Sequence, residues 1–191
     1  MNMQVPRSAI TQHEGTRLSA RYLTVLRMAH AELPDYGRGG LQFYPVVRSM
    51  IDRQNFRSLL DYGCGKGAFV HLIRHHFSER LDLIGGYDPA VSGFEEEPPP
   101  ADIVTCFDVL DFVEPRYLRH VLQHVAGLTR STALFAVETA PVDSRPSRDV
   151  QSPSFWRSEL ETAFDVIEQQ PFDIWMLFAC RPRPTHPSTA A

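Results

Sequence analysis

The sequence predicts an α/β fold in which a mostly parallel β-sheet is flanked by helices. From Ser58 onward, short apolar segments with strand character alternate with segments of helical periodicity, which is the pattern of parallel sheets. The last two strands, near 166–169 and 174–179, have no helix between them. We therefore expect these two strands to pair as an antiparallel hairpin at the C-terminal edge of the sheet.

Two helices are predicted before the first strand. Apolar residues recur at helical spacing from Leu18 to Ala29, and the Pro-Asp-Tyr-Gly sequence at 34–37 ends that pattern. A second helix is expected over 41–51. We expect the region 15–55 to form a helical cap over the binding edge of the sheet. The polar residues 1–14 carry no periodicity and are expected to be a flexible arm.

The remaining elements follow from apolar runs and turn residues. A proline at the first turn favours a helix beginning at Pro115. In chain order the sequence predicts strand 58–62, a glycine-rich segment 63–67, helix 68–77, strands 81–87 and 103–107, helix 115–128, strand 133–137, loop 140–153, helix 155–164 and the terminal hairpin. Residues 15–180 are expected to be one domain, with the α/β core at 56–180 and a disordered, proline-containing tail at 181–191.

Composition narrows the class of protein. The chain has 191 residues, of which 43% are hydrophobic, enough for one domain with a single core. Its 19 basic and 23 acidic residues give a net charge of −4, which argues against nucleic-acid binding through phosphate neutralisation. No apolar run approaches the roughly 18 residues of a spanning helix. The three widely spaced cysteines, Cys64, Cys106 and Cys180, are typical of reduced thiols, so we expect a cytoplasmic location and no membrane partner.

The most informative segment runs from Leu59 to Ala68. A strand leads into glycines at alternate positions, and a helix follows, so the backbone can approach a ligand closely and offers free N–H groups. The spacing is G-x-G-x-G, not the G-x-G-x-x-G typical of dinucleotide binding. Asp88 ends the next strand, where a carboxylate can accept hydrogen bonds from ribose hydroxyls. Together these features predict a nucleoside-type cofactor at the carboxyl ends of parallel strands.

These residues resemble the class I S-adenosylmethionine-dependent methyltransferases, which have a Rossmann-like fold. The segment 61–67 matches the first motif of that family, 87–89 its second motif, and 101–115 its fourth-strand signature. The resemblance covers 57–139 and is greatest to small stand-alone bacterial members. It implies S-adenosyl-L-methionine as cofactor and S-adenosyl-L-homocysteine as product.

The resemblance also implies which residues bind this cofactor. Asp61 and the glycine loop would face its methionine part, Asp88 its ribose, and Tyr87, Pro89 and the fourth strand its adenine. The full set of expected cofactor-binding residues is Asp61, Gly63, Cys64, Gly65, Gly67, Tyr87, Asp88, Pro89, Phe107 and Asp108. Only 13 residues separate Asp88 from Asp102, where the family fits a helix and a strand, so the adenine wall within 89–101 is left open.

Methyl transfer by in-line displacement requires mainly that the acceptor be held at near-attack distance. A hydroxyl acceptor often needs a base, and the candidates are Asp108 and Asp111 after the fourth strand. Alternatively, Asp108 positions the methionine part and Asp111 is an ordinary acid at a helix entry. Where relatives carry a histidine as base or metal ligand, this chain has Phe112, and no metal is expected.

Candidates for the acceptor pocket lie in the loops. They are Tyr36 and Arg38 between the first two helices, Glu138 at the end of a strand, and Arg145, Arg148 and Trp156 in or just after the following loop. Arginines and aromatic rings would suit an anionic or planar acceptor, although a plain turn and a solvated loop with a core tryptophan explain them almost as well. His30, in the expected cap, is a further candidate for a substrate contact.

The function indicated is therefore methyl transfer from S-adenosylmethionine to a small-molecule acceptor. Three alternatives remain at this stage: a nucleotide-cofactor-dependent oxidoreductase, a non-catalytic module that binds S-adenosylmethionine or a partner, and an RNA or protein methyltransferase. No nucleic-acid partner is expected. The acceptor and the oligomeric state stay open.

Overall fold

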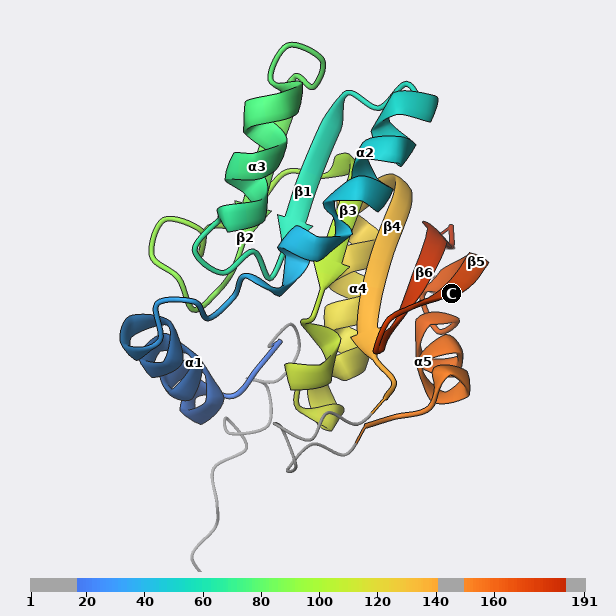
Figure 1. Ribbon diagram of the computed structural model, residues 1–191. Coiled ribbons are helices and arrows are strands. Elements are labelled where there is room, and N and C mark those ends of the chain that lie inside the picture. Colours follow the sequence, from blue (N-terminus) through green and yellow to red (C-terminus); the bar gives the residue numbers. More distant parts are fainter. Residues whose placement is uncertain (1–16, 141–149, 185–191) are drawn as a thin grey trace, which may run out of the picture.

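The computed structural model describes residues 17–140 and 150–184 and is built around a six-stranded sheet (Figure 1). The strands are β1 (Ser58–Tyr62), β2 (Leu83–Tyr87), β3 (Ala101–Phe107), β4 (Thr129–Glu138), β5 (Phe164–Phe172) and β6 (Trp175–Pro182). Their order in the sheet is β2-β1-β3-β4-β6-β5, and β1 to β4 are parallel. β6 runs antiparallel to both β4 and β5, so the predicted edge hairpin and the predicted fold class are confirmed.

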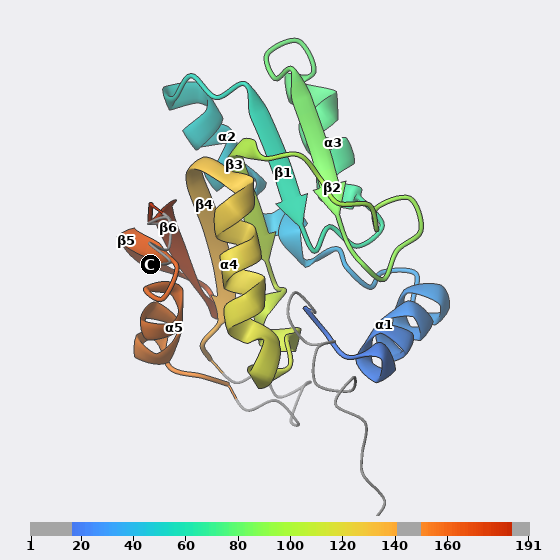
Figure 2. The ribbon, with the colours of Figure 1, turned by 180° about the vertical axis from the view of Figure 1, so that it is seen from behind.

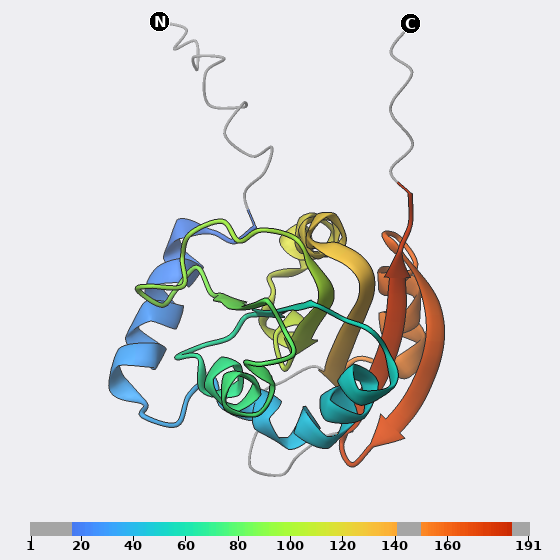
Figure 3. The same ribbon diagram turned by 90° about the horizontal axis from the view of Figure 1, so that it is seen from above.

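Helices cover both faces of this sheet (Figures 2 and 3). One face packs against α2 (Tyr44–Arg53) and α3 (Ala68–Phe77), whose apolar residues join a buried cluster with β1. The other face packs against α4 (Leu118–Leu128) and α5 (Pro153–Leu160). Because both faces are covered, β1 is buried along its whole length, as is usual for strands of a parallel sheet.

Helix α1 (Ala20–Glu32) lies beyond the sheet, at the end toward which β1 and β2 point (Figure 1). None of its residues is buried, whereas Val47 and Ile51 of α2 are fully buried against the sheet. Of the two helices predicted as a cap, α1 therefore lies over the sheet end, and α2 belongs to the packed core. A 3-10 helix, η2 (Gly39–Phe43), leads from the α1 side into α2.

Most predicted elements lie close to where the sequence places them, but several boundaries differ; the helix predicted from Pro115, for example, begins at Leu118, after a 3-10 turn at Pro115–Tyr117. Helix α5 begins at Pro153 because the Ser152 side chain accepts a hydrogen bond from the Phe155 amide, and Phe164, predicted to end it, begins β5. Strand β4 begins at Thr129 instead of Ala133. Arg181 and Pro182, predicted to begin the tail, belong to β6.

The described part of the chain contains no helix with the length and apolar character needed to cross a membrane. Cys64, Cys106 and Cys180 are all buried free thiols, and burial raises the pKa of the Cys106 thiol well above its usual value. Residues 1–14, predicted as an arm, lie outside the described residues.

Candidate cofactor site

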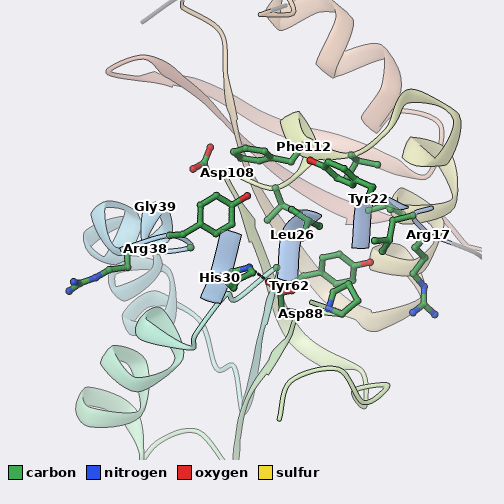
Figure 4. A pocket seen from close by; sticks show the side chains of 18 of the residues that line it. Arg17, Tyr22, Leu26, His30, Arg38, Gly39, Tyr62, Asp88, Asp108 and Phe112 are labelled. Carbon is green, nitrogen blue, oxygen red and sulfur yellow. Dashed lines mark ion pairs between the residues drawn. The ribbon is translucent and has the colours of Figure 1, made fainter. Parts of the chain in front are cut away.

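A cavity of about 580 Å³ lies between α1 and the carboxyl ends of β1, β2 and β3 (Figure 4). Its floor comes from residues at or just after the ends of these strands, and its cover comes from α1 and the segment that follows α1. The lining residues of the strand ends and the turns after them are Tyr62, Gly63, Asp88, Pro89, Asp108, Val109, Phe112 and Val113, with Val121 of α4. Ligands of parallel α/β sheets bind at this edge of the sheet.

The glycine loop begins directly after β1 with Gly63, whose φ of 76° favours glycine. A Cβ atom at this position would also lie 2.3 Å from Cγ2 of Val109, so no side chain fits here. The amides of Gly63 and Cys64 both donate hydrogen bonds to the carbonyl oxygen of Tyr87, at 2.7 and 3.1 Å. The loop is thus held against the end of β2 and turned toward the cavity.

Asp88 holds the turn that follows β2. Its Oδ2 accepts a hydrogen bond from the amide of Gly65 at 3.0 Å, and its Oδ1 accepts one from the amide of Ala90 at 2.9 Å. Asp88 lines the cavity, and its side chain is 11% exposed. Each carboxylate oxygen has a second acceptor site, so Asp88 can organise the loop and still accept hydrogen bonds from a bound ligand.

Asp108, at the end of β3, faces the opposite side of the cavity (Figure 4). Its φ of 56° places it in the left-handed region, which is uncommon for a residue with a side chain. Its amide donates to the carbonyl of Ala136 at 3.0 Å. The segment after α1 comes very close here, since a Cβ on Gly39 would lie 2.7 Å from the Asp108 Oδ2. Asp108 is therefore fixed at the junction of the sheet and the covering segment.

Asp61 does not line the main cavity; it lines a smaller one of about 30 Å³, which Gly63 and Asp108 also line. Its carboxylate accepts a hydrogen bond from the Thr105 hydroxyl at 2.8 Å. Burial raises the pKa of Asp61 to about 7, the Thr105 hydrogen bond opposes this shift, and the Asp88 charge adds to it. The side chain therefore titrates near neutral pH.

A polar cluster closes the side of the cavity next to Tyr62. Arg17 donates to the Tyr87 hydroxyl at 2.8 Å and pairs with Glu97 at 3.0 Å. The Tyr62 hydroxyl bonds to the His124 Nδ1 at 3.0 Å, and the other nitrogen of His124 contacts Glu97. Through these contacts the short 89–101 segment, which the sequence left open, is joined to the chain before α1 and to α4.

The structure brings some of the predicted residues to the main cavity and keeps others away from it. Those that line it are Gly63, Asp88, Pro89, Asp108, Tyr36 and Arg38. Asp61 and Phe107 line the smaller cavity. Gly65 and Gly67 are covered by Gly37 and Phe94 respectively, Cys64 is buried against Gly86, and the Tyr87 hydroxyl is bonded to Arg17.

Three of the remaining candidates, Asp111, Glu138 and Trp156, line neither cavity. Asp111 accepts a hydrogen bond from the Glu138 amide at 3.3 Å, and Glu138 itself is 2% exposed. Trp156 packs in the core cluster between the sheet and α5. Arg145 and Arg148 lie outside the described residues. Within the described ranges, no group of at least three His, Cys, Asp or Glu side chains is placed to hold a metal ion.

Sequence reasoning did not identify most of the residues that cover the cavity. Leu18, Tyr22, Leu26 and His30 come from α1 or the residues just before it, and Arg17 precedes them. These four residues are spaced four apart; Leu18, Tyr22 and Leu26 belong to the apolar stripe that predicted the helix, and they line the cavity. A stripe of this kind normally indicates that a helix packs on a hydrophobic core. The sequence therefore carries no signal that distinguishes a helix packed on the core from a helix that covers a cavity.

One family model, described as "Methyltransferase domain", matches residues 25–179 of this chain. The matched residues include the glycine loop, Asp88, Asp108 and most of α1. None of the curated proteins is significantly similar to the chain in sequence.

Several solved structures share the fold. The magnesium protoporphyrin IX methyltransferase (ChlM) of Synechocystis PCC 6803, with SAM bound, has 15% sequence identity and a TM-score of 0.59, and the match covers 87% of this chain and 100% of that one. An O-methyltransferase family protein from Burkholderia thailandensis has 15% identity and a TM-score of 0.59, with 80% of this chain covered. The present chain spans 61% of the length of that protein.

A third similar structure is the N,N-8-amino-8-demethyl-D-riboflavin dimethyltransferase (RosA) of Streptomyces davawensis. It has 15% identity and a TM-score of 0.58, and the match covers 75% of this chain and 55% of that protein. At these identities the likeness concerns the fold.

Proposed function

The chain belongs to the S-adenosylmethionine-dependent methyltransferases, whose domain model matches residues 25–179, and from this premise we propose that it methylates a small molecule. The observation that carries the proposal is the covered cavity of about 580 Å³ at the ends of β1, β2 and β3. Cavities that enclose small ligands span roughly 300–1,000 Å³. The cofactor and a small acceptor are the ligands that such a covered space suits.

The residues around the cavity fit the cofactor. The Asp88 carboxylate lies at the end of β2, where it could accept hydrogen bonds from a ribose diol. Gly63, which lines the same cavity, has no side chain that would block the ligand. Apolar side chains of Leu18, Val109 and Val113 offer a surface for the adenine ring. When bound, S-adenosylmethionine supplies an electrophilic methyl group on a sulfonium, so the protein needs mainly to orient the acceptor and exclude water.

The acceptor side of the cavity lies by Asp108, Tyr36 and Phe112. The rings of Tyr36 and Phe112 meet edge to face, with centroids 6.3 Å apart, and Arg38 lines the same region. Aromatic rings and a guanidinium favour a planar or anionic small molecule. α1 and the segment 35–39 cover the cavity and would hinder the approach of a protein or RNA chain. The net charge of −4 also gives no support to nucleic-acid binding.

Asp108 is the residue we propose to act on the acceptor, either as base or by positioning it. It lines the cavity, whereas Asp111 is engaged with the Glu138 amide and lines neither cavity. Substitution Asp108→Asn separates the two roles. Loss of a base lowers kcat and removes the acidic limb of its pH profile, while loss of positioning raises the KM for the acceptor.

The decisive experiment is incubation of the full chain with isotopically labelled S-adenosylmethionine and a library of small metabolites, followed by mass spectrometry of labelled products. We expect label in a small molecule, and much less label with the Asp88→Ala variant when S-adenosylmethionine is kept below its raised Kd. Label recovered only in RNA or in protein from a cell extract would overturn the small-molecule assignment. Tight binding of NAD with no binding of S-adenosylhomocysteine would contradict the cofactor assignment.

A further inference from the structure

His30, on the last turns of α1, points into the cavity beside Asp88 (Figure 4). Its Nε2 lies 3.8 Å from the Asp88 Oδ2, which is close but longer than a hydrogen bond. The His30 side chain is 9% exposed. Across the described residues, its Nδ1 finds no hydrogen-bond partner.

The surroundings of His30 hold the ring in this place. The Tyr36 ring packs against it edge to face, with centroids 4.8 Å apart. The backbone of Gly37 approaches so closely that a Cβ there would lie 3.2 Å from the His30 Cε1. His30 is therefore a positioned group rather than a side chain free to turn toward water.

A buried polar nitrogen without a partner is rare in folded proteins. Burial lowers the pKa of His30, with the Asp88 charge opposing and the Lys66 charge adding to this shift, so the imidazole is neutral near pH 7. A neutral imidazole has one donor and one acceptor. Nδ1 is itself buried beside Gly37, so a ligand in the cavity would meet the ring at Nε2, the nitrogen that faces Asp88.

We propose that His30 is a second residue that binds the cofactor ribose, next to Asp88, from whose carboxylate its Nε2 lies 3.8 Å away. This inference rests on the proposed function. It assigns the ribose contact to one group from the sheet and one from the covering helix.

The two groups are chemically complementary. The Asp88 carboxylate only accepts hydrogen bonds and already takes one from each of the Gly65 and Ala90 amides. Each of the two hydroxyls of a ribose diol can both donate and accept a hydrogen bond. Asp88 can accept the hydrogen bonds that these hydroxyls donate, but it has no donor for their oxygen atoms. The imidazole N–H of His30 supplies the missing donor. Since His30 belongs to α1, the cofactor would also hold that helix in place.

The test measures binding of two ligands to the wild type, His30→Ala and His30→Gln. Binding of S-adenosylhomocysteine is measured by calorimetry, and binding of its 2′,3′-dideoxyribose analogue is measured by competition calorimetry. We expect His30→Ala to raise the Kd for S-adenosylhomocysteine about five- to tenfold, as for loss of one good hydrogen bond. The dideoxy analogue should bind wild type and His30→Ala equally. His30→Gln, which keeps a donor and an acceptor, should recover part of the loss.

Met28→Ala is the matched control, because Met28 lies on the same helix and is 53% exposed. Thermal melting of each variant confirms that it is folded. An unchanged or lower Kd in His30→Ala, or an equal loss with the dideoxy analogue, would overturn the inference while leaving the proposed function intact. A wild-type protein that binds no S-adenosylhomocysteine would overturn both.

Discussion

The Nζ of Lys66 donates a hydrogen bond of 2.9 Å to the carbonyl oxygen of Leu33, and a second of 3.2 Å to that of Pro34. Lys66 is the only lysine among the 19 basic residues of the chain, and it stands inside the glycine loop. Its ammonium thus ties this loop to the residues that end α1. At the other end of α1, the Ser19 amide donates to Glu114 at 2.8 Å. Because α1 has no buried residue, its position depends on such polar contacts.

Substitution Lys66→Met should loosen α1 without removing a cofactor contact. We expect a few-fold rise in the Kd for S-adenosylhomocysteine, consistent with exposed hydrogen bonds worth about 1 kcal/mol. Amide hydrogen exchange should accelerate over Ala20–Glu32 and stay unchanged in α3.

Two controls accompany the lysine variant. Lys66→Arg keeps a donor and should behave nearly as wild type, and Arg48→Met removes an exposed ion pair with Asp52 on α2, remote from the cavity. Unchanged exchange in α1 of Lys66→Met would show that the lysine does not hold the helix.

Substitution Asp88→Ala should weaken binding of S-adenosylhomocysteine by tenfold or more, because charge-assisted hydrogen bonds contribute about 1.5–3 kcal/mol. It should also lower the melting temperature, since the Gly65 and Ala90 amides lose their acceptor. Asp88→Asn separates the two effects, because the amide oxygen still accepts one hydrogen bond. Calorimetry and thermal melting are the measurements, and an unchanged Kd in Asp88→Ala would exclude a role in ribose binding.

Substitution Gly63→Ala should destabilise the fold for two separable reasons. A side chain at a φ of 76° costs about 1–2 kcal/mol, and its Cβ would lie 2.3 Å from the Val109 side chain, an overpacking that costs about 1–3 kcal/mol more. Urea unfolding should show that Val109→Ala relieves the second cost but not the first, so the double variant is more stable than additivity predicts. Additive losses would contradict the steric clash.

The sequence was most informative where local chemistry decides the structure. The bounds of β1 (Ser58–Tyr62) and α3 (Ala68–Phe77) coincide with those predicted, because an apolar run ends at glycines and a periodic stripe follows them. The start of β4 was missed because its first four residues are polar and the three after Thr129 are exposed or partly exposed. There the strand is set by pairing with β3, which local propensity does not reveal.

The site was predictable mainly from the sheet side, with Tyr36, Arg38 and His30 as the candidates named on the covering side. Gly63, Asp88 and Asp108 follow strand ends, so the motif spacing locates them. Cover residues such as Tyr22 and Leu26, which were not site candidates, are brought in by long-range packing of α1. Trp156 was expected near the acceptor and is buried in the core instead, since an aromatic side chain beside a loop is equally suited to either place.

The pH dependence of stability should depend on Asp61. In the fold its pKa is raised by burial from 3.8 to about 7, so the folded state binds a proton that the unfolded state releases between these values. The stabilising contribution of Asp61 is therefore fully present below pH 3.8 and is lost as the pH rises through about 7. Above that pH the fold contains a buried carboxylate, at a cost of the order of a few kcal/mol.

Substitution Asp61→Asn should remove this dependence, because a neutral amide of the same shape still accepts the hydrogen bond from Thr105. We expect the variant to melt at a higher temperature than wild type at pH 8 and the difference to shrink as the pH falls toward 5. Its affinity for S-adenosylmethionine should fall, because the residue predicted to face the methionine part has lost its charge. Melting curves at five pH values decide the matter: a constant offset between the two proteins would mean that Asp61 does not titrate in this range.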